Sequence, residues 1–167
     1  AVRPLISALT DAERYGSAMI NDLNSGSVAW TDWNILLDER GGPNHVDNFC
    51  FAPVHADTRT GELVYTPSYY YIGHFAKFIR PRAQRVSASA SRGSLLTTAF
   101  LNPDGRLATV VMNQGDEDIA YTLNVAQPDF DFSRREIAQF LLYVEGNTTR
   151  MKVTHVTLDR SQRKGAD

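Results

Sequence analysis

The sequence has 167 residues, enough for one domain with its own core or for two small units, with 43% hydrophobic and 22% charged residues. Its net charge of −2 gives no reason to expect a nucleic acid or an acidic membrane as partner. The one cysteine, Cys50, excludes an internal disulfide and is predicted to be a small buried residue. No apolar run approaches the about 18 residues of a membrane span, so none is predicted.

The first elements predicted are a helix, a strand and a loop. Residues 10–24 are predicted to be helical, because Thr10 and Glu13 have the spacing of a capping box and apolar residues then recur every four positions. Residues 28–37 read as a strand, and a loop begins at Gly41. This order is half of a βαβ unit and favours a parallel sheet or barrel.

The stretch 29–51, AWTDWNILLDERGGPNHVDNFCF, is predicted to bind a ligand. It places two tryptophans, an aspartate and an asparagine where a structural strand would carry aliphatic residues. Clustered aromatic and polar side chains of this kind are typical of binding sites.

The next segment, 52–66, is predicted to be irregular, with a turn at Thr60-Gly61. A second helix follows, with Thr66 as its cap and Pro67 at its first position, and Arg80-Pro81 ends it.

After Pro81 the apolar residues alternate, which predicts an antiparallel meander with turns at Asn102–Gly105 and Gln114–Glu117. The predicted strands are 85–90, 95–101, 106–112 and 119–125. The last forty residues predict a helix over 133–146, from a capping box and an apolar stripe, and then a strand over 151–158.

Three motifs carry a resemblance. WTDWN, GGPNHVDNF and YYYIGHFAKFIRP, in this order and spacing, resemble the C-terminal part of glycoside hydrolase family 30, the glucosylceramidase-like enzymes. The likeness runs from Tyr15 to Val125. It implies an α+β fold, with the terminal β/α unit of a (β/α)8 barrel followed by an antiparallel β-sandwich-type meander. The helix–strand pair at the C-terminus is atypical for the family.

The resemblance divides the chain into three predicted parts. Residues 1–81 form the end of the barrel, 82–126 the antiparallel domain, and 127–167 a helix–strand segment of uncertain origin. The family also favours a secreted or periplasmic protein, without determining the compartment.

The catalytic carboxyl pair is predicted to be missing. Retaining glycosidases need two carboxyl groups about 5–5.5 Å apart, and in the resembling family both are glutamates upstream of the matched part. Asp32 is expected to make structural hydrogen bonds, and Asp38-Glu39 to form a solvated turn. We therefore expect no catalytic residue here and no hydrolysis by this chain alone.

The resemblance assigns Trp33 and Asn48 to the wall of the glucose pocket. An indole face suits the C–H side of a pyranose, and an amide both donates and accepts hydrogen bonds. Two alternatives stay open: Trp33 as a core residue, and Asn48 as the cap of a turn. His45 is a candidate for the pocket rim.

No metal or cofactor site is expected, because the four histidines lack ligand spacing. The expected partners are a β-glucoside or glucosylceramide-like substrate and a missing upstream barrel segment. The alternative function is a non-catalytic carbohydrate-binding or protein-interaction module.

Overall fold

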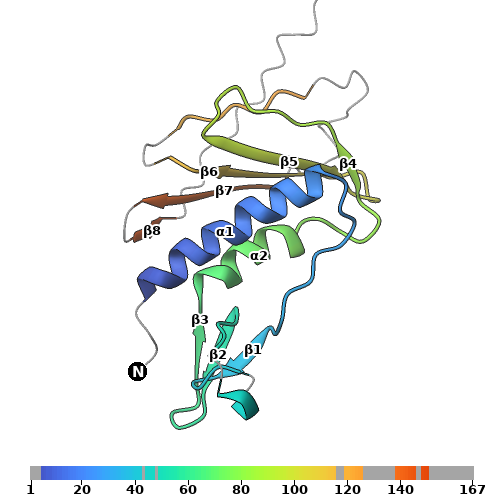
Figure 1. The fold of residues 1–167 in the computed structure, drawn as a ribbon. Helices are drawn as coiled ribbons and strands as arrows, with labels where there is room; N and C mark the ends of the chain where they lie inside the picture. The colour runs from blue at the N-terminus through green and yellow to red at the C-terminus, as the bar shows by residue number, and fades with distance from the viewer. Residues whose placement is uncertain are drawn as a thin grey trace, which may run out of the picture. The chain divides into compact units, whose positions relative to one another are not determined.

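The computed structural model describes residues 5–42, 44–47, 49–115, 119–125, 138–145 and 148–150. The chain forms two compact units, Ala1–Arg80 and Pro81–Asp167, and each is described by itself. The first unit holds two helices and a three-stranded sheet, and the second holds a five-stranded sheet (Figure 1).

Helix α1 runs from Leu5 to Asn24, so it begins earlier than predicted and Thr10 lies inside it. The predicted capping box is therefore wrong. Residues 5–9 (LISAL) include leucine and isoleucine and no helix breaker, so nothing between Pro4 and Thr10 stops the helix. The helix ends as expected near Gly26, whose φ of 100° is left-handed.

The strand predicted over 28–37 is wrong for most of its length. Only Leu36–Asp38 forms a strand, β1, and the residues before it are irregular. Val28 is fully exposed and Ile35 is 74% exposed. A strand is stabilised by a paired neighbour along its edge. The described residues give 28–35 no such pairing: the Ile35 carbonyl oxygen accepts from the Val54 N–H at 3.0 Å, and Trp30 and Asp32 contact α1 through their side chains.

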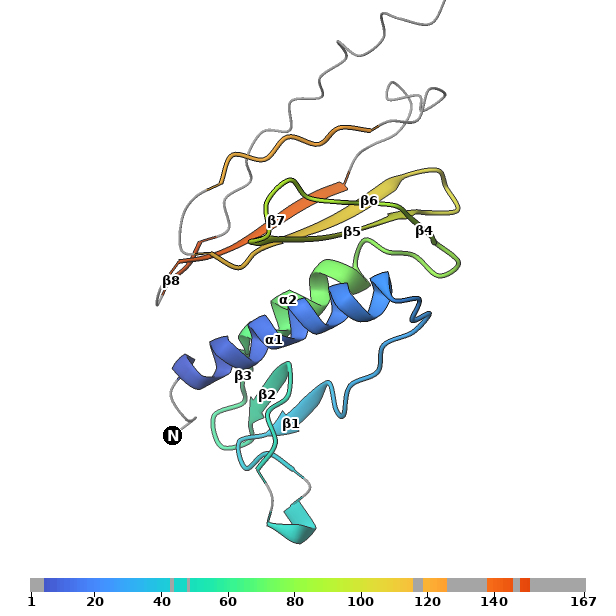
Figure 2. The ribbon, with the colours of Figure 1, turned by 45° about the horizontal axis from the view of Figure 1, so that its top comes forward.

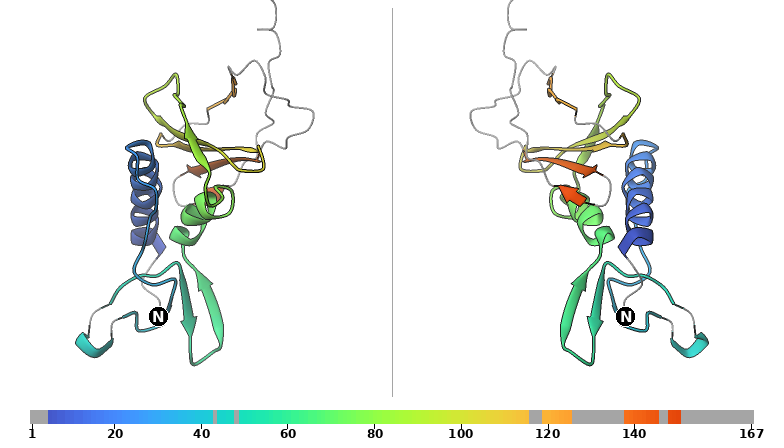
Figure 3. Two further views of the ribbon diagram at one scale, coloured as in Figure 1. Left: turned by 90° about the vertical axis from the view of Figure 1, so that its right-hand side faces the viewer. Right: turned by 90° about the vertical axis from the view of Figure 1, so that its left-hand side faces the viewer.

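Residues 52–66 form a β-hairpin rather than the irregular segment predicted. Strand β2 (Val54–Asp57) pairs antiparallel with β3 (Glu62–Tyr65), and the turn between them contains Gly61 as predicted. On its other edge β2 pairs in parallel with β1. The sheet order is β1-β2-β3, and the hairpin stands out clearly in Figure 3.

Helix α2 runs from Pro67 to Ala76, one turn short of the predicted end. Thr66 occupies the cap position and Pro67 the first turn, as predicted, but the Thr66 hydroxyl donates to the carbonyl oxygen of Ala52 at 3.0 Å instead of capping the helix. The two helices of the unit pack side by side (Figure 1). Their buried apolar residues include Ala12, Met19, Ile20, Tyr71 and Phe75.

The Tyr71→Phe substitution is expected to raise the free energy of unfolding of the first unit by about 1 kcal/mol. The Tyr71 hydroxyl is buried without a hydrogen-bond partner among the described residues, and its burial raises the pKa of Tyr71. The gain should grow as pH rises above 10.0, where ionisation favours the unfolded wild type. Both tryptophans lie in this unit, so urea unfolding followed by their fluorescence measures it.

The matched control is Tyr69→Phe on the same helix, where the ring is 40% exposed and the hydroxyl removed is not buried. This variant should unfold within about 0.5 kcal/mol of wild type. A Tyr71→Phe variant that is less stable than wild type at pH 7 would show that the hydroxyl has a partner.

The second unit is built on a sheet in the order β4-β5-β6-β7-β8 (Figure 2). The predicted antiparallel pairing holds for β4 (Gln84–Val86), β5 (Leu95–Leu101) and β6 (Leu107–Asn113). The turn after β5 also forms as predicted, with the Gly105 N–H donating to Asn102 O at 2.8 Å.

Two of the predicted meander strands are not strands in full. The first ends at Val86, and residues 119–125 form no strand at all. Leu123 and Val125 instead pack against the buried Ala99 and Leu107. The alternation there reflects one side of an extended segment lying on the apolar core, which does not require pairing in a sheet.

The helix predicted over 133–146 is wrong, because Ala138–Glu145 forms strand β7 and pairs in parallel with β6. The segment AQFLLYVE contains residues that favour strands, and a short apolar run fits a helix or a strand equally by spacing. Strand β8 (Thr148–Arg150) follows antiparallel to β7. The predicted strand 151–158 lies outside the described residues.

Candidate functional site

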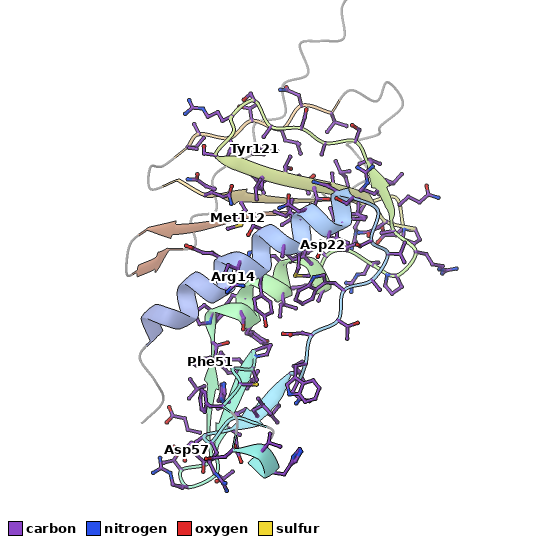
Figure 4. The ribbon with its side chains drawn as sticks, in the orientation of Figure 1. Arg14, Asp22, Phe51, Asp57, Met112 and Tyr121 are labelled. Atoms are coloured by element: carbon purple, nitrogen blue, oxygen red, sulfur yellow. The ribbon has the colours of Figure 1, made fainter. Side chains whose placement is uncertain are left out.

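The WTDWN segment is fastened to the second half of α1. The Tyr15 hydroxyl donates to Asp32 Oδ1 at 3.2 Å, and the Tyr15 ring meets Trp30 edge-on with 5.4 Å between centroids. The Trp30 indole N–H donates to Asp22 Oδ2 at 3.3 Å. Asp22, which is labelled in Figure 4, lies near the C-terminal end of α1. The structural role expected for Asp32 is confirmed.

Trp33 follows directly after this attachment, and its side chain is 65% exposed. Its backbone N–H donates to Asp32 Oδ1 at 2.8 Å, which fixes the backbone at the point where the indole leaves it. Trp33 precedes β1 by three positions. It therefore lies before a strand, whereas the active-site residues of a (β/α)8 barrel lie at the carboxyl ends of the strands. An indole that is 65% exposed is nonetheless not a core residue, which was the alternative for Trp33.

The GGPNHVDNF loop follows β1. Asn48, the second predicted pocket residue, lies outside the described residues, as does Pro43. His45 lies in the short 3-10 helix η1 (Asn44–Val46) and is exposed. Cys50 is partly exposed, so the prediction of a buried cysteine is wrong. The cause is its position in the loop, between two aromatic residues that pack on one another.

The loop is closed at its base by Gly41. Its φ is 68°, and a Cβ atom there would lie 2.8 Å from both the carbonyl oxygen of Cys50 and the ring of Phe49. The two ends of the loop therefore touch at a position that only glycine occupies without strain.

His55, in β2, connects the end of β1 to the residues that follow the GGPNHVDNF loop. It is 2% exposed. Its Nε2 accepts from the Ala52 N–H at 3.0 Å, and its Nδ1 lies 3.0 Å from the carbonyl oxygen of Asp38. Phe49 stacks on the imidazole and Phe51 meets its edge. No role was predicted for His55 from the sequence, although a histidine inside the apolar segment FAPVHA is a signal of a buried, hydrogen-bonded side chain.

Two carboxylates stabilise the turn at the tip of the hairpin. Glu39 accepts from the backbone N–H and the hydroxyl of Thr58 at 2.9 and 3.0 Å, and these bonds lower the pKa of Glu39. Asp57 forms an ion pair with Arg59 at 2.9 Å, and hydrogen bonds from Arg59 lower the pKa of Asp57 to about 2. Figure 4 shows Asp57 at the far end of the hairpin from Phe51. Both groups act as anionic turn residues.

Among the residues that the structure describes, no cluster of histidine, cysteine or carboxylate side chains could hold a metal ion. No described helix is long and apolar enough to cross a membrane.

Two family models match consecutive parts of the sequence. The Glycosyl hydrolase family 30 TIM-barrel domain matches residues 6–79, and the Glycosyl hydrolase family 30 beta sandwich domain matches residues 83–140. The chain belongs to glycoside hydrolase family 30. Its fold class is thus the end of a family 30 barrel followed by the family's β-sandwich domain. The likeness was expected to end at Val125, but the match continues to residue 140. It thus reaches the start of β7, which is a further strand of the same sheet.

Relatives in family 30 are longer than this chain. Lysosomal acid glucosylceramidase of Mus musculus is 39% identical over 120 residues, which is 71% of this chain and 23% of that protein. Putative glucosylceramidase 2 of Caenorhabditis elegans is 37% identical over 105 residues, 62% of this chain and 20% of that protein. The chain thus spans about a fifth of the length of the curated relatives it matches.

Two solved structures are similar to this chain in fold. The crystal structure of SrfJ from Salmonella typhimurium is 37% identical with a TM-score of 0.64, over 66% of this chain and 25% of that one. The endo-beta1,6-glucanase BT3312 has a TM-score of 0.57 at 24% identity, over 64% of this chain and 24% of that one, and shows the fold alone.

The barrel part of this family 30 chain carries an unusual apolar surface. Ten large apolar side chains of the first unit are exposed. They are Val28, Trp33, Ile35, Leu36, Val46, Phe49, Leu63, Tyr65, Tyr69 and Tyr70. Three of them, Tyr65, Tyr69 and Tyr70, adjoin one another through ring contacts. Adjoining exposed apolar residues mark surfaces that bind another polypeptide or a ligand.

Proposed function

We propose that this chain is the C-terminal part of a retaining β-glucosidase of the glucosylceramidase type. It supplies one wall of the glucose site, and the two catalytic glutamates come from earlier strands of the barrel. The substrate class is a β-glucoside or a glucosylceramide-like lipid, which is supported by the names of the relatives in mouse and C. elegans. The three-part division into 1–81, 82–126 and 127–167 remains a prediction.

The exposed apolar residues of the first unit carry this proposal. A (β/α)8 barrel is a closed ring of parallel strands, whereas this unit has one parallel pair, β1 and β2, with an antiparallel strand beyond it. Ile35 and Leu36 are 74% and 51% exposed at the start of β1. Preceding barrel strands would bury them.

Two carboxylates at the hairpin turn, Glu39 and Asp57, lack the properties of a catalytic acid. A retaining enzyme needs a general acid that keeps its proton near neutral pH, which requires a raised pKa. The pKa values of Glu39 and Asp57 are both lowered, and each carboxylate is already bonded to a turn. We therefore assign neither of them to catalysis.

Trp33 and Asn48 are proposed to contact the sugar. The exposed indole of Trp33 offers a flat face for the C–H side of a pyranose, and the Asp32 bond fixes its backbone. Asn48 belongs to the GGPNHVDNF loop, whose ends are closed by Gly41 and His55.

A non-catalytic carbohydrate-binding module is the second candidate. The observation in its favour is the row of exposed tyrosines, Tyr65, Tyr69 and Tyr70, with ring centroids 4.8 and 5.4 Å apart. This candidate requires sugar affinity that does not depend on any second polypeptide.

The test is hydrolysis of an aryl β-glucoside by the full chain alone. We expect no turnover above the uncatalysed rate, because both catalytic glutamates are proposed to lie outside this chain. Glu39→Gln and Asp57→Asn serve as controls for trace contaminating enzyme, since activity that survives both changes does not come from these acids. Turnover that disappears when an acid of residues 1–167 is replaced would overturn the proposal.

A further inference from the structure

His55 uses both nitrogens of its ring inside a closed environment. Nε2 accepts from the Ala52 N–H, so it carries a lone pair and no hydrogen. Nδ1 faces the carbonyl oxygen of Asp38 at 3.0 Å, which requires a hydrogen on that nitrogen. The two contacts together select the neutral tautomer protonated at Nδ1.

The two bonds join segments that are far apart in sequence. Asp38 is the last residue of β1, and His55 lies in β2. Ala52 lies between them, three residues after the GGPNHVDNF motif ends at Phe49. The imidazole therefore links the strand that enters the loop to the segment that leaves it. Phe49 stacks on the ring at 6.2 Å between centroids with 6° between planes, and Phe51 meets it at 6.0 Å and 81°.

We propose that His55 is a positioning residue for this loop. It holds Phe49–Ala52 against the end of β1, and so sets where the loop stands relative to Trp33 and the sugar. The claim that this affects sugar binding rests on the proposed function. The claim that His55 fixes the position of Phe49–Ala52 does not.

A purely packing residue would not need these contacts. Leucine or phenylalanine would fill the site but would remove the acceptor of the Ala52 N–H, in a residue that is 1% exposed. The Nδ1 contact to the Asp38 carbonyl oxygen would be lost as well, although that oxygen also accepts from the Gly41 N–H at 3.1 Å. Histidine fills the site and bonds both groups. Gly41 completes the arrangement, because the close approach of its backbone to Cys50 allows the two loop ends to meet.

Cys50 provides the readout, since it is the one thiol of the chain and lies within the held segment. The rate of its reaction with a soluble disulfide reagent under native conditions measures opening of Phe49–Ala52. Four full-length proteins are compared: wild type, His55→Phe, His55→Asn and Phe75→Leu. His55→Phe keeps a ring and loses both bonds, His55→Asn keeps a donor for Asp38, and Phe75→Leu loosens the buried helix packing elsewhere in the unit.

We expect His55→Phe to raise the Cys50 reaction rate at least about tenfold and His55→Asn to fall between it and wild type. Phe75→Leu, compared at a temperature equally far below its melting point, should stay within about twofold of wild type. Equal rates in wild type and His55→Phe would overturn the proposal, and so would equal rates in His55→Phe and Phe75→Leu.

A second measurement separates this inference from the proposed function. The indole N–H resonance of Trp33 is followed during titration with methyl β-glucoside, with the Trp30 indole as internal reference. A shift in wild type that weakens severalfold in His55→Phe supports both ideas. No shift in wild type contradicts the proposed sugar contact, and the Cys50 rates then still decide the role of His55.

Discussion

The Gly41→Ala substitution is expected to destabilise the first unit by about 3 kcal/mol or more, whereas Gly61→Ala should cost about 1–2 kcal/mol. Both glycines have left-handed backbones, with φ of 68° and 75°. An added Cβ at Gly61 meets nothing within 4 Å, but at Gly41 it would lie 2.8 Å from the Cys50 carbonyl oxygen. Gly61 thus measures the backbone cost alone, and the difference between the variants measures the close approach of the loop ends.

Urea unfolding followed by tryptophan fluorescence gives both values, because Trp30 and Trp33 lie in this unit. The reaction rate of Cys50 should also rise in Gly41→Ala and stay unchanged in Gly61→Ala, since only the first variant pushes against the Cys50 backbone. Equal losses of stability in the two variants would mean that the loop ends are not in contact.

Features set by a few neighbouring residues could be predicted from the sequence. Pro67 after Thr66 fixed the start of α2 and Gly105 fixed the turn between β5 and β6, because the backbone preferences of proline and glycine act locally. The antiparallel pairing of β5 and β6 followed from alternation and that turn.

Features set by distant partners could not. The stretch 28–37 has the composition of a strand, yet a strand needs neighbours, and only Leu36–Asp38 finds one, in β2. The segment Ala138–Glu145 has apolar spacing that fits a helix or a strand, and the parallel partner β6 decides for the strand. Neither partner is visible in the segment itself.

The candidate site divides in the same way. Trp33 and Asn48 were assigned through the family motifs, and the structure adds that the Trp33 indole is exposed and that Asp32 holds its backbone. His55 belongs to no motif, and spacing along the chain does not bring it together with Asp38 and Phe49. Its role follows only from the pairing of β1 with β2.

Under the proposed function, adding the earlier strands of a family 30 barrel is expected to raise the melting temperature and the cooperativity of the first unit. The probe is SrfJ with its segment matching this chain deleted, since that segment is 37% identical. Burial of an exposed leucine or isoleucine contributes about 1.5–3 kcal/mol at most, so several such residues together give a large shift. A melting curve that does not change on mixing would contradict the proposal of an incomplete barrel and favour the independent module.

Ile35 makes this test specific to the β1 side of the sheet. Because its side chain is 74% exposed, Ile35→Ser should change the stability of the chain alone by less than about 0.5 kcal/mol. In the mixture the same variant should lose much of the gain in melting temperature, because serine cannot replace the buried apolar contact. Ile35→Val is the matched control and should keep most of the gain. If Ile35→Ser behaves like wild type in the mixture, the barrel strands do not cover β1, and the exposed surface binds something else.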